Sequence, residues 1–242
     1  MDFYESYRAY VRGKVTTMSA AGAADAATRE RAAGEARRYF LLALASERRP
    51  LLRPAVVAVG GLIAAGKSTA AERIAAEISA PIVDADRTRK FLLGVEAEDK
   101  VEVPAFQGPY SPGFSEKVYG ELLRRAAAVL SSGRPVVLDA SFRSRRHRAA
   151  ARRLAADQGV PFGFVECRVD LDVSRERLRR RALSANVSDG RLEILDDFAA
   201  RWQPADELPE SSHLVLDTSR PVEDNVEILR RRLAAWSAER VG

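Results

Sequence analysis

Short apolar runs alternate with amphipathic stretches from residue 55 to the end of the chain. The apolar runs predict five buried strands, over 55–59, 81–86, 135–140, 161–169 and 213–218. Longer stretches with helical spacing lie between and after them, over 67–79, 116–131, 145–157, 173–183, 191–201 and 222–238. This alternation is typical of an α/β fold in which helices cover both faces of a parallel sheet. We therefore expect a three-layer sandwich with a central five-stranded parallel sheet.

The N-terminal part of the chain has a different texture, because it is rich in Ala and Arg. Its helical spacing is interrupted by the small and polar residues 18–27 and resumes over 29–46, and Pro50 then breaks it. The pattern thus divides the chain into a helical extension, residues 1–50, and an α/β domain, residues 51–242.

Several classes of protein are excluded by composition. The single cysteine, Cys167, rules out an intrachain disulfide and a zinc site built on cysteines, and His147 and His213 show no metal-ligand spacing. No apolar run approaches the roughly 18 residues of a membrane span. The first ten residues lack the basic start and apolar stretch of a secretory signal. We therefore expect a cytoplasmic protein without a membrane partner.

The charge of the chain is modestly positive. The net charge is +5, from 39 basic and 34 acidic residues, and 34 of the basic residues are arginines. Guanidinium groups match phosphate oxygens, so this content favours anionic ligands, and a pI near 9.6 is compatible with nucleic acid. A base-composition bias of the genome produces the same Arg- and Ala-rich texture. The charge alone therefore decides little.

The segment from Gly61 to Ser68 fits the pattern G-x-x-x-x-G-K-[ST] and lies between a predicted strand and a predicted helix. Such a loop wraps a phosphate with backbone N–H groups at the positive end of a helix. Lys67 then reaches the β- and γ-phosphates, and the hydroxyl of Ser68 binds Mg²⁺. The strand–turn–helix context disfavours the alternative of a glycine-rich turn that binds nothing. The predicted nucleotide-binding residues are Gly61, Ala64, Ala65, Gly66, Lys67, Ser68 and Thr69.

Two acids, Asp84 and Asp86, close the second predicted strand. The carboxyl ends of parallel strands share one edge of the sheet, so these acids are expected beside the phosphate loop. A carboxylate there can accept the proton of a hydroxyl during phosphoryl transfer, and we assign this role to Asp86. Arg89, three residues later, is a candidate to bind an anionic acceptor. The alternative is a helix N-cap followed by ordinary helix charges.

Asp139 closes the third predicted strand and is a candidate Mg²⁺ ligand together with Ser68. The alternative role is a cap for the turn that follows. An arginine run comes directly after it, at positions 143, 145, 146 and 148. From this run we predict Arg148 as a second substrate-binding residue, against the alternative of a solvated helix face.

Five arginines lie within residues 175–181, before a polar segment. Like charges at this density repel one another unless an anion neutralises them. Arg177 and Arg181 share one helix face, as expected for an arginine-bearing lid that covers ATP near residues 175–201. We predict both as catalytic, together with Lys67 and Asp86. The alternative is a charged surface helix.

With these residues in hand, the chain from about 55 to 240 resembles the kinase-type P-loop phosphotransferases. This group includes 5′-hydroxyl polynucleotide kinases, gluconate-kinase-like enzymes, chloramphenicol phosphotransferase and zeta toxins. The strongest resemblance is to the P-loop ATPase domain that follows an aminoglycoside-phosphotransferase-like domain in bacterial proteins. The matching segments are GGLIAAGKST (60–69), DADRTRK (84–90), VYGELLRRAAAVLSSGRPVVLDASF (118–142), RERLRRR (175–181), SDG (188–190) and VLDT (215–218).

The resemblance implies a P-loop NTPase sandwich with the strand of Asp139 beside the strand of the P-loop. It implies that the pair Asp86 and Arg89 forms the D-x-x-R element of the polynucleotide kinases, with a base and an acceptor-phosphate arginine. It also implies an adenine-contacting loop over 215–221. Residues 1–45 resemble the last helices of the fused domain, and they are a candidate contact for a homo-oligomer.

The function indicated is an ATP- and Mg²⁺-dependent kinase that acts on a hydroxyl of an anionic acceptor. The acceptor is a polynucleotide 5′-hydroxyl or a small metabolite, and the preference for ATP over GTP is not decided by the sequence. A regulatory ATPase that transfers only to water is the first alternative. A binding module with a vestigial P-loop is the second.

Overall fold

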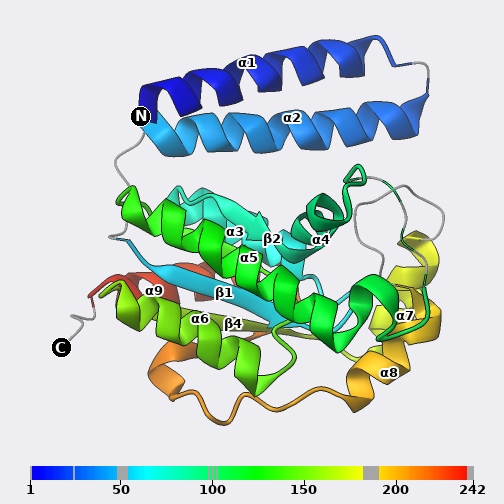
Figure 1. Cartoon of the computed structure of the whole chain (residues 1–242), viewed down its shortest axis with the longest axis vertical. Coiled ribbons are helices and arrows are strands. Elements are labelled where there is room, and N and C mark those ends of the chain that lie inside the picture. Colours follow the sequence, from blue (N-terminus) through cyan, green and yellow to red (C-terminus); the bar gives the residue numbers. More distant parts are fainter. Residues whose placement is uncertain are drawn as a thin grey trace.

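The computed structural model describes residues 2–23, 25–47, 54–97, 99, 101, 103–181 and 191–238. In it a helical hairpin lies beside an α/β unit (Figure 1). The α/β unit has five strands among the described residues: β1 (Val56–Gly61), β2 (Ile82–Asp84), β3 (Val136–Asp139), β4 (Phe162–Arg168) and β5 (His213–Asp217). All pair in parallel, in the order β2-β3-β1-β4-β5. The predicted five-stranded parallel sheet is confirmed, as is the place of β3 beside β1.

Helices cover both faces of this sheet. Their bounds are α3 (Lys67–Ile78), α4 (Ala85–Leu93), α5 (Pro112–Ser131), α6 (Arg145–Asp157), α7 (Leu171–Arg181), α8 (Leu195–Ala200) and α9 (Val222–Ala238). Three short 3₁₀ turns are η1 (Gly108–Tyr110), η2 (Leu192–Ile194) and η3 (Glu210–Ser212). Helices α5 and α6 lie in front of the sheet in Figure 1. The predicted strands and helices occur in the predicted order, and α4, which was not among the predicted helices, lies between β2 and α5.

Alternation along the strands builds two separate cores. Val56 and Ala58 of β1 pack with Leu122 of α5 on one face, whereas Val57 and Val59 pack with helices α3 and α9 on the other. The central strands β1, β3 and β4 are buried on both faces almost throughout and therefore read as continuous apolar runs, whereas the edge strands β2 and β5, also expected to be buried, are partly exposed. The result is the predicted three-layer sandwich.

Two local predictions were wrong. The second strand ends at Asp84 rather than at residue 86, because the Asp84 carboxylate accepts a hydrogen bond from the backbone N–H of Arg87 at 2.7 Å and caps α4. Asp86 therefore lies in the first turn of α4 and not at a strand end. The helix predicted over 191–201 is instead divided into η2 and α8.

The N-terminal hairpin consists of α1 (Asp2–Ala21) and α2 (Ala26–Glu47), which pack mainly against each other. α1 is longer than predicted and ends inside the segment expected to be a loop. An ion pair of 3.6 Å between Arg38 and Glu72 joins α2 to α3. The outer face of α1 exposes Tyr7, Val15 and Met18, and self-association through it stays a prediction. Within the described residues, no helix combines the length and apolar character that crossing a bilayer requires.

Gly163 offers a test of the packing between β4 and α9. A Cβ atom at Gly163 would overlap the ring of Trp236, which is 3% exposed. We expect Gly163→Ala to lower the free energy of unfolding by about 1–3 kcal/mol, because the buried ring has little room to shift. Gly120→Ala, in an open position on α5, should instead raise it by about 0.5–1 kcal/mol. Urea unfolding followed by circular dichroism compares the two variants, and a neutral Gly163→Ala would contradict this packing.

Candidate active site

The loop from Gly61 to Ser68 connects β1 to α3 with a backbone that two glycines permit. Gly61 has φ +145°, and a Cβ there would overlap the carbonyl oxygen of Cys167. Gly66 adopts a left-handed conformation (φ +79°) as the N-cap of α3. Because a glycine N-cap contributes no side chain, the first N–H groups of α3 are left for another acceptor. The positive end of the helix dipole makes that acceptor an anion.

Ala64 takes a conformation in this loop that ordinarily favours glycine. Its φ is +59°, and its side chain is buried. Two hydrogen bonds support the backbone: Arg177 donates from Nη1 to the carbonyl of Ala64 at 3.1 Å, and Thr218 donates from Oγ1 to the carbonyl of Ala65 at 3.0 Å. The loop is thus held from outside by α7 and by the residue that follows β5.

Lys67 and Ser68 begin α3 and face the acids of the neighbouring strands. The Lys67 ammonium donates to the carbonyl of Leu62 at 2.7 Å, within the loop itself. Ser68 forms a hydrogen bond with the carboxylate of Asp139, which is 5% exposed. Burial raises the pKa of Asp139, and the nearby Lys67 charge acts in the opposite direction. The sequence analysis expected Ser68 and Asp139 to lie together, and the parallel pairing of β1 with β3 brings them together.

Asp84 and Asp139 are register partners across β2 and β3. Burial, followed by repulsion from Asp139 and Asp86, raises the pKa of Asp84 to about 7. Among the described residues no group of three or more His, Cys, Asp or Glu is arranged to hold a metal. A hydroxyl beside a carboxylate nevertheless provides the hard oxygen donors that suit Mg²⁺, an ion that keeps much of its shell as water and substrate phosphates. Ser68 and Asp139 therefore fit such an ion.

Asp86 is held by Arg89 within α4. Arg89 donates from Nη1 to Asp86 at 2.8 Å and from Nε to the carbonyl of Pro109 at 3.1 Å, and it lies 4.2 Å above the ring of Tyr110. The Arg89 side chain is 8% exposed, whereas that of Asp86 is 33% exposed. The geometry makes Arg89 a support for Asp86, so its role in binding an acceptor stays a prediction.

Two clefts meet at the phosphate loop. The first, which we name the β2-side cleft, has a volume of about 120 Å³ and is lined by Lys67, Asp86 and Asp139 together with aromatic side chains. The second, the β5-side cleft, has a volume of about 270 Å³ and is lined by Arg177 and Thr218. Ala64 and Gly66 line both clefts. The loop therefore forms the wall between two binding spaces.

Arg148 does not have the predicted role. Its side chain is fully buried, and it donates from Nε to Glu207 at 2.6 Å and to the carbonyls of Phe142 and Pro204 at 2.9 Å. The Nε, Nη1 and Nη2 atoms of its guanidinium all donate to these partners, so the group is occupied within the protein and does not face a substrate. We correct the assignment: Arg148 joins the chain after β3 to the segment before β5.

The arginines of α7 are also paired more than the sequence suggested. Arg175 pairs with Asp172 and Asp196, and Arg180 pairs with Glu176. These three acids offset part of the charge of the five arginines, so the helix depends less on an external anion than the sequence suggested. Arg177 instead donates to Thr218 and to the phosphate loop, at the β5-side cleft. The side chain of Arg181 and the lid segment 183–190 lie outside the described residues, so their roles stay predictions.

The β2-side cleft also contains residues that sequence analysis did not assign. Phe106, Tyr119, Arg143 and Phe198 line it, and all but Tyr119 come from loops or short helices without a periodic pattern. Thr218 was part of a recognised segment but was not predicted as a support of the phosphate loop. The arginine run was a local signal for Arg143, but only as one of four candidates, and no local signal identifies the others, because the packing of distant segments brings these residues together.

The buried state of Arg148 leads to a stability prediction. Arg148→Met should lower the free energy of unfolding by about 3 kcal/mol, because it breaks a buried ion pair and leaves two carbonyls without a donor. Arg145→Met removes a neighbouring ion pair of exposed side chains and should cost less than about 1 kcal/mol. Urea denaturation of both variants measures the difference. Equal effects, or a loss of substrate binding without a loss of stability for Arg148→Met, would restore the original assignment.

Comparison with known proteins finds relatives that match most of this chain. The chain is 33% identical over 225 residues to uncharacterized proteins of Mycobacterium tuberculosis and Mycobacterium bovis. The match covers 93% of this chain and 42% of each relative, so the chain spans less than half the length of these curated relatives.

Solved structures share the fold at low sequence identity. A gluconokinase from Sinorhizobium meliloti is 21% identical with a TM-score of 0.55, covering 76% of this chain and 94% of that one. Kti12 from Chaetomium thermophilum, in complex with ADP-AlF3, is 16% identical with a TM-score of 0.59 and coverages of 76% and 100%. The APS kinase CysC from Mycobacterium tuberculosis, in complex with AMPPNP and APS, is 20% identical with a TM-score of 0.54 and coverages of 76% and 99%.

The family assignment rests on the α/β unit. Residues 56–205, which include the phosphate loop, Asp86 and Asp139, match the family described as AAA domain. The parallel sheet order and the kinase neighbours give the same result for the fold. The chain therefore belongs to the AAA domain family and has the fold of the kinase-type P-loop phosphotransferases.

Proposed function

We propose that this protein is an ATP- and Mg²⁺-dependent kinase that transfers the γ-phosphoryl group to a hydroxyl of an anionic acceptor. The observation that carries the proposal is the meeting of two clefts at the phosphate loop. A phosphoryl donor bound along this wall exposes its terminal phosphate to the β2-side cleft, where Asp86 lies. An enzyme that transfers only to water needs no second cleft with its own carboxylate.

The donor side uses backbone and cationic groups. The N–H groups at the start of α3 and the Lys67 ammonium would bind the β- and γ-phosphates. The nucleoside would occupy the β5-side cleft, which Gly66 and Thr218 both line. Arg177 belongs to this side, since its hydrogen bonds within the described residues go to the loop and to Thr218. Ser68 and Asp139 would hold Mg²⁺, which neutralises phosphate charge when it is bound.

The acceptor side uses Asp86. One oxygen of Asp86 is engaged by Arg89, which orients the carboxylate, and the other can receive the proton of the acceptor hydroxyl as it attacks phosphorus. Asp84 is less suited, because its carboxylate already caps α4. We therefore keep Asp86 as the base. This choice is supported by the exposure of the Asp86 side chain and by its hydrogen bond with Arg89. A strand face shared with Asp84 gives no support, because Asp86 lies on α4.

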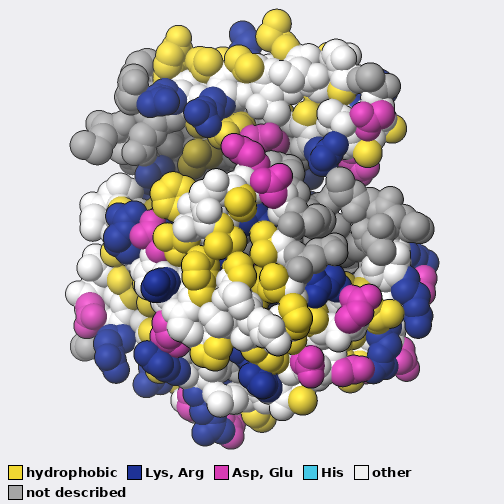
Figure 2. Space-filling view, turned by 45° about the vertical axis from the view of Figure 1, so that its right-hand side comes forward, with side chains coloured by type: hydrophobic (Ala, Val, Ile, Leu, Met, Phe, Trp, Pro, Cys, Tyr) yellow, Lys and Arg dark blue, Asp and Glu magenta, His cyan; other side chains and the backbone are white. Residues whose placement is uncertain are grey.

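A small acceptor is favoured over a polynucleotide. Figure 2 shows Lys and Arg side chains mixed with acidic ones on the face that it presents, without a continuous basic patch among the described residues there. Backbone binding of nucleic acid relies on such patches. Gluconokinase and APS kinase, among the structural neighbours, are named for small anionic acceptors. Transfer of ³²P from [γ-³²P]ATP across a panel of sugar acids, phosphate esters and 5′-hydroxyl oligonucleotides tests the proposal directly.

Lys67 provides the first test of the donor side. Lys67→Ala removes a charged donor from the phosphates, and we expect ATP affinity to fall about 10- to 100-fold. Turnover should be lost while the melting curve is retained, because the ammonium supports only one loop carbonyl. Calorimetric titration with Mg-AMPPNP measures the affinity, and Lys117→Ala on the exposed face of α5 is the matched control. Unchanged ATP affinity in folded Lys67→Ala would remove the basis for nucleotide binding here.

Asp86 provides the test of the acceptor side. Asp86→Asn keeps the size of the side chain and removes the proton acceptor, so transfer should fall roughly 10²- to 10⁴-fold while ATP affinity stays near wild type. Asp84→Asn makes the same chemical change next to it and preserves the helix cap, since Asn also serves as an N-cap. We expect a smaller loss there. A larger loss in Asp84→Asn, with both variants folded and binding ATP, would reverse the assignment.

A further inference from the structure

Arg143 lies in the β2-side cleft without the carboxylate partner that its neighbours have. Arg145 pairs with Asp206, Arg146 with Glu116, and Arg148 with Glu207. For Arg143 the contacts within the described residues are to aromatic rings, and no hydrogen bond or ion pair of its guanidinium is found there. Of the four arginines in this run, it is therefore the one whose charge the surrounding described residues leave uncompensated.

A second guanidinium contacts the same phenyl ring as Arg143. Arg143 is 4.6 Å from the ring centroid of Phe106 and 5.4 Å from that of Phe198, and these two rings stack at 4.8 Å. Arg201 lies 3.9 Å from the centroid of Phe106. Burial lowers the pKa of Arg143, Tyr119 acts in the opposite direction, and the charge of Arg201 lowers it further. Aromatic faces compensate a guanidinium only in part.

The backbone around Arg143 is held on several sides. Phe142 has φ +44°, a strained conformation for a bulky residue. Its N–H donates to the Tyr119 hydroxyl at 2.9 Å, and its carbonyl accepts from Arg148 at 2.9 Å. The carbonyl of Arg143 accepts from the N–H of Gln203 at 3.0 Å. Strain that the surrounding structure maintains is a feature of preorganised binding sites.

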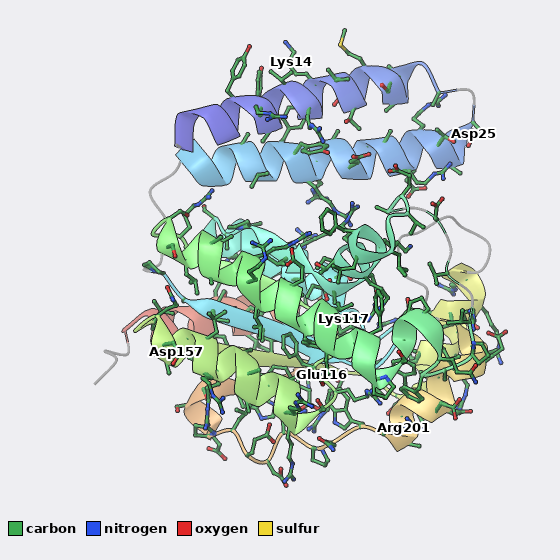
Figure 3. The ribbon with its side chains drawn as sticks, in the orientation of Figure 1. Lys14, Asp25, Glu116, Lys117, Asp157 and Arg201 are labelled. Carbon is green, nitrogen blue, oxygen red and sulfur yellow. The ribbon has the colours of Figure 1, made fainter. Side chains whose placement is uncertain are left out.

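The cleft brings Arg143 to the same space as Asp86, whereas the Arg201 guanidinium, within the described residues, reaches only the ring of Phe106. Arg143, Phe106 and Phe198 line the cleft together with Asp86 and Lys67. Figure 3 labels Arg201, after α8, and Glu116, near the start of α5, toward the same end of the α/β unit. Arg89, the residue predicted for acceptor binding, is engaged by Asp86 and Pro109. The cleft therefore offers an anion a guanidinium other than the expected one.

We propose that Arg143 binds the carboxylate or phosphate group of a small acceptor whose hydroxyl faces Asp86. This inference rests on the proposed kinase function, since it names the residues that select the acceptor of that same site. It makes the acceptor a small hydroxylated carboxylic acid or phosphate ester. The Phe106–Phe198 pair forms the apolar wall against which the carbon skeleton of such a molecule packs.

The test measures anion binding without knowledge of the natural acceptor. Wild-type protein is saturated with Mg-AMPPNP, which fills the phosphate loop including the γ position, and is titrated with sulfate and separately with acetate at constant ionic strength. We expect saturable binding in calorimetry or in the fluorescence of Trp202, which follows Arg201. Arg143→Gln should weaken the tighter of the two anions about tenfold or more, as expected for loss of a charged hydrogen-bond donor. Preference for sulfate indicates a phosphate ester, and preference for acetate a carboxylic acid.

Arg146→Gln is the matched control, because Arg146 belongs to the same run and its exposed side chain pairs with Glu116. It should bind the anions like wild type. Arg143→Lys keeps the charge and loses the fork, so it should recover part of the affinity that Arg143→Gln loses. Equal anion affinity in wild type and folded Arg143→Gln, or no saturable binding to wild type below about 50 mM, a concentration that already corresponds to less than about 2 kcal/mol of binding free energy, would overturn the proposal.

A kinetic arm separates this inference from the proposed function. In the ³²P screen, transfer should favour gluconate over glucose, or glycerol phosphate over glycerol, and Arg143→Gln should raise the KM of the charged acceptor with little change in kcat. Transfer to neutral acceptors alone would contradict the anion site while leaving the kinase in place. Absence of AMPPNP binding and of ATP turnover would instead contradict the kinase, and the anion titration would then be compared between wild type and Arg143→Gln without nucleotide.

Discussion

The register between β1, β3 and β2 is the constraint on which the site depends. Val59 pairs with Asp139, and Asp139 pairs with Asp84, so two acids reach the sheet edge at which the chain turns into the phosphate loop. Side chains alternate along a strand, and a slip of one residue would turn Asp139 to the other face and separate it from Ser68. The buried apolar residues of the same strands prevent such a slip, because it would also exchange the two cores.

This register has an electrostatic cost that the rest of the site offsets. The buried carboxylate of Asp139 lies beside the partly buried one of Asp84, and the pKa of Asp84 rises to about 7. The Lys67 charge favours the ionised form of Asp139. The arrangement places negative charge on one side of the loop wall and leaves cationic and N–H donors along the wall itself. Such a separation suits a reaction in which a phosphate is bound and a hydroxyl loses its proton.

Arginine side chains around the candidate active site have two different roles. Arg89, Arg148 and Arg177 hold other groups in place: the Asp86 carboxylate, the carbonyls of Phe142 and Pro204, and the phosphate loop. Arg143 holds none of the described polar groups and faces the cleft. Because a guanidinium has five donors in a rigid fork, its surroundings decide between support and binding. An arginine-rich sequence leaves that decision open.

The amino-acid sequence is enough to predict the fold class, the order of the strands and the phosphate loop. These follow from local patterns: continuous apolar runs for strands buried on both faces, and a glycine–lysine–serine spacing that only a strand–loop–helix turn accommodates. The pairing of Asp139 with Ser68 could also be predicted from the sequence, since parallel topology brings strand ends together. Only the tertiary structure shows where α4 begins, which places Asp86 on a helix, and that Arg148 is buried in an ion pair with Glu207. It alone assembled Phe106, Arg143 and Arg201, which lie far apart along the chain, because contacts between loops depend on packing and leave no periodic trace in the sequence.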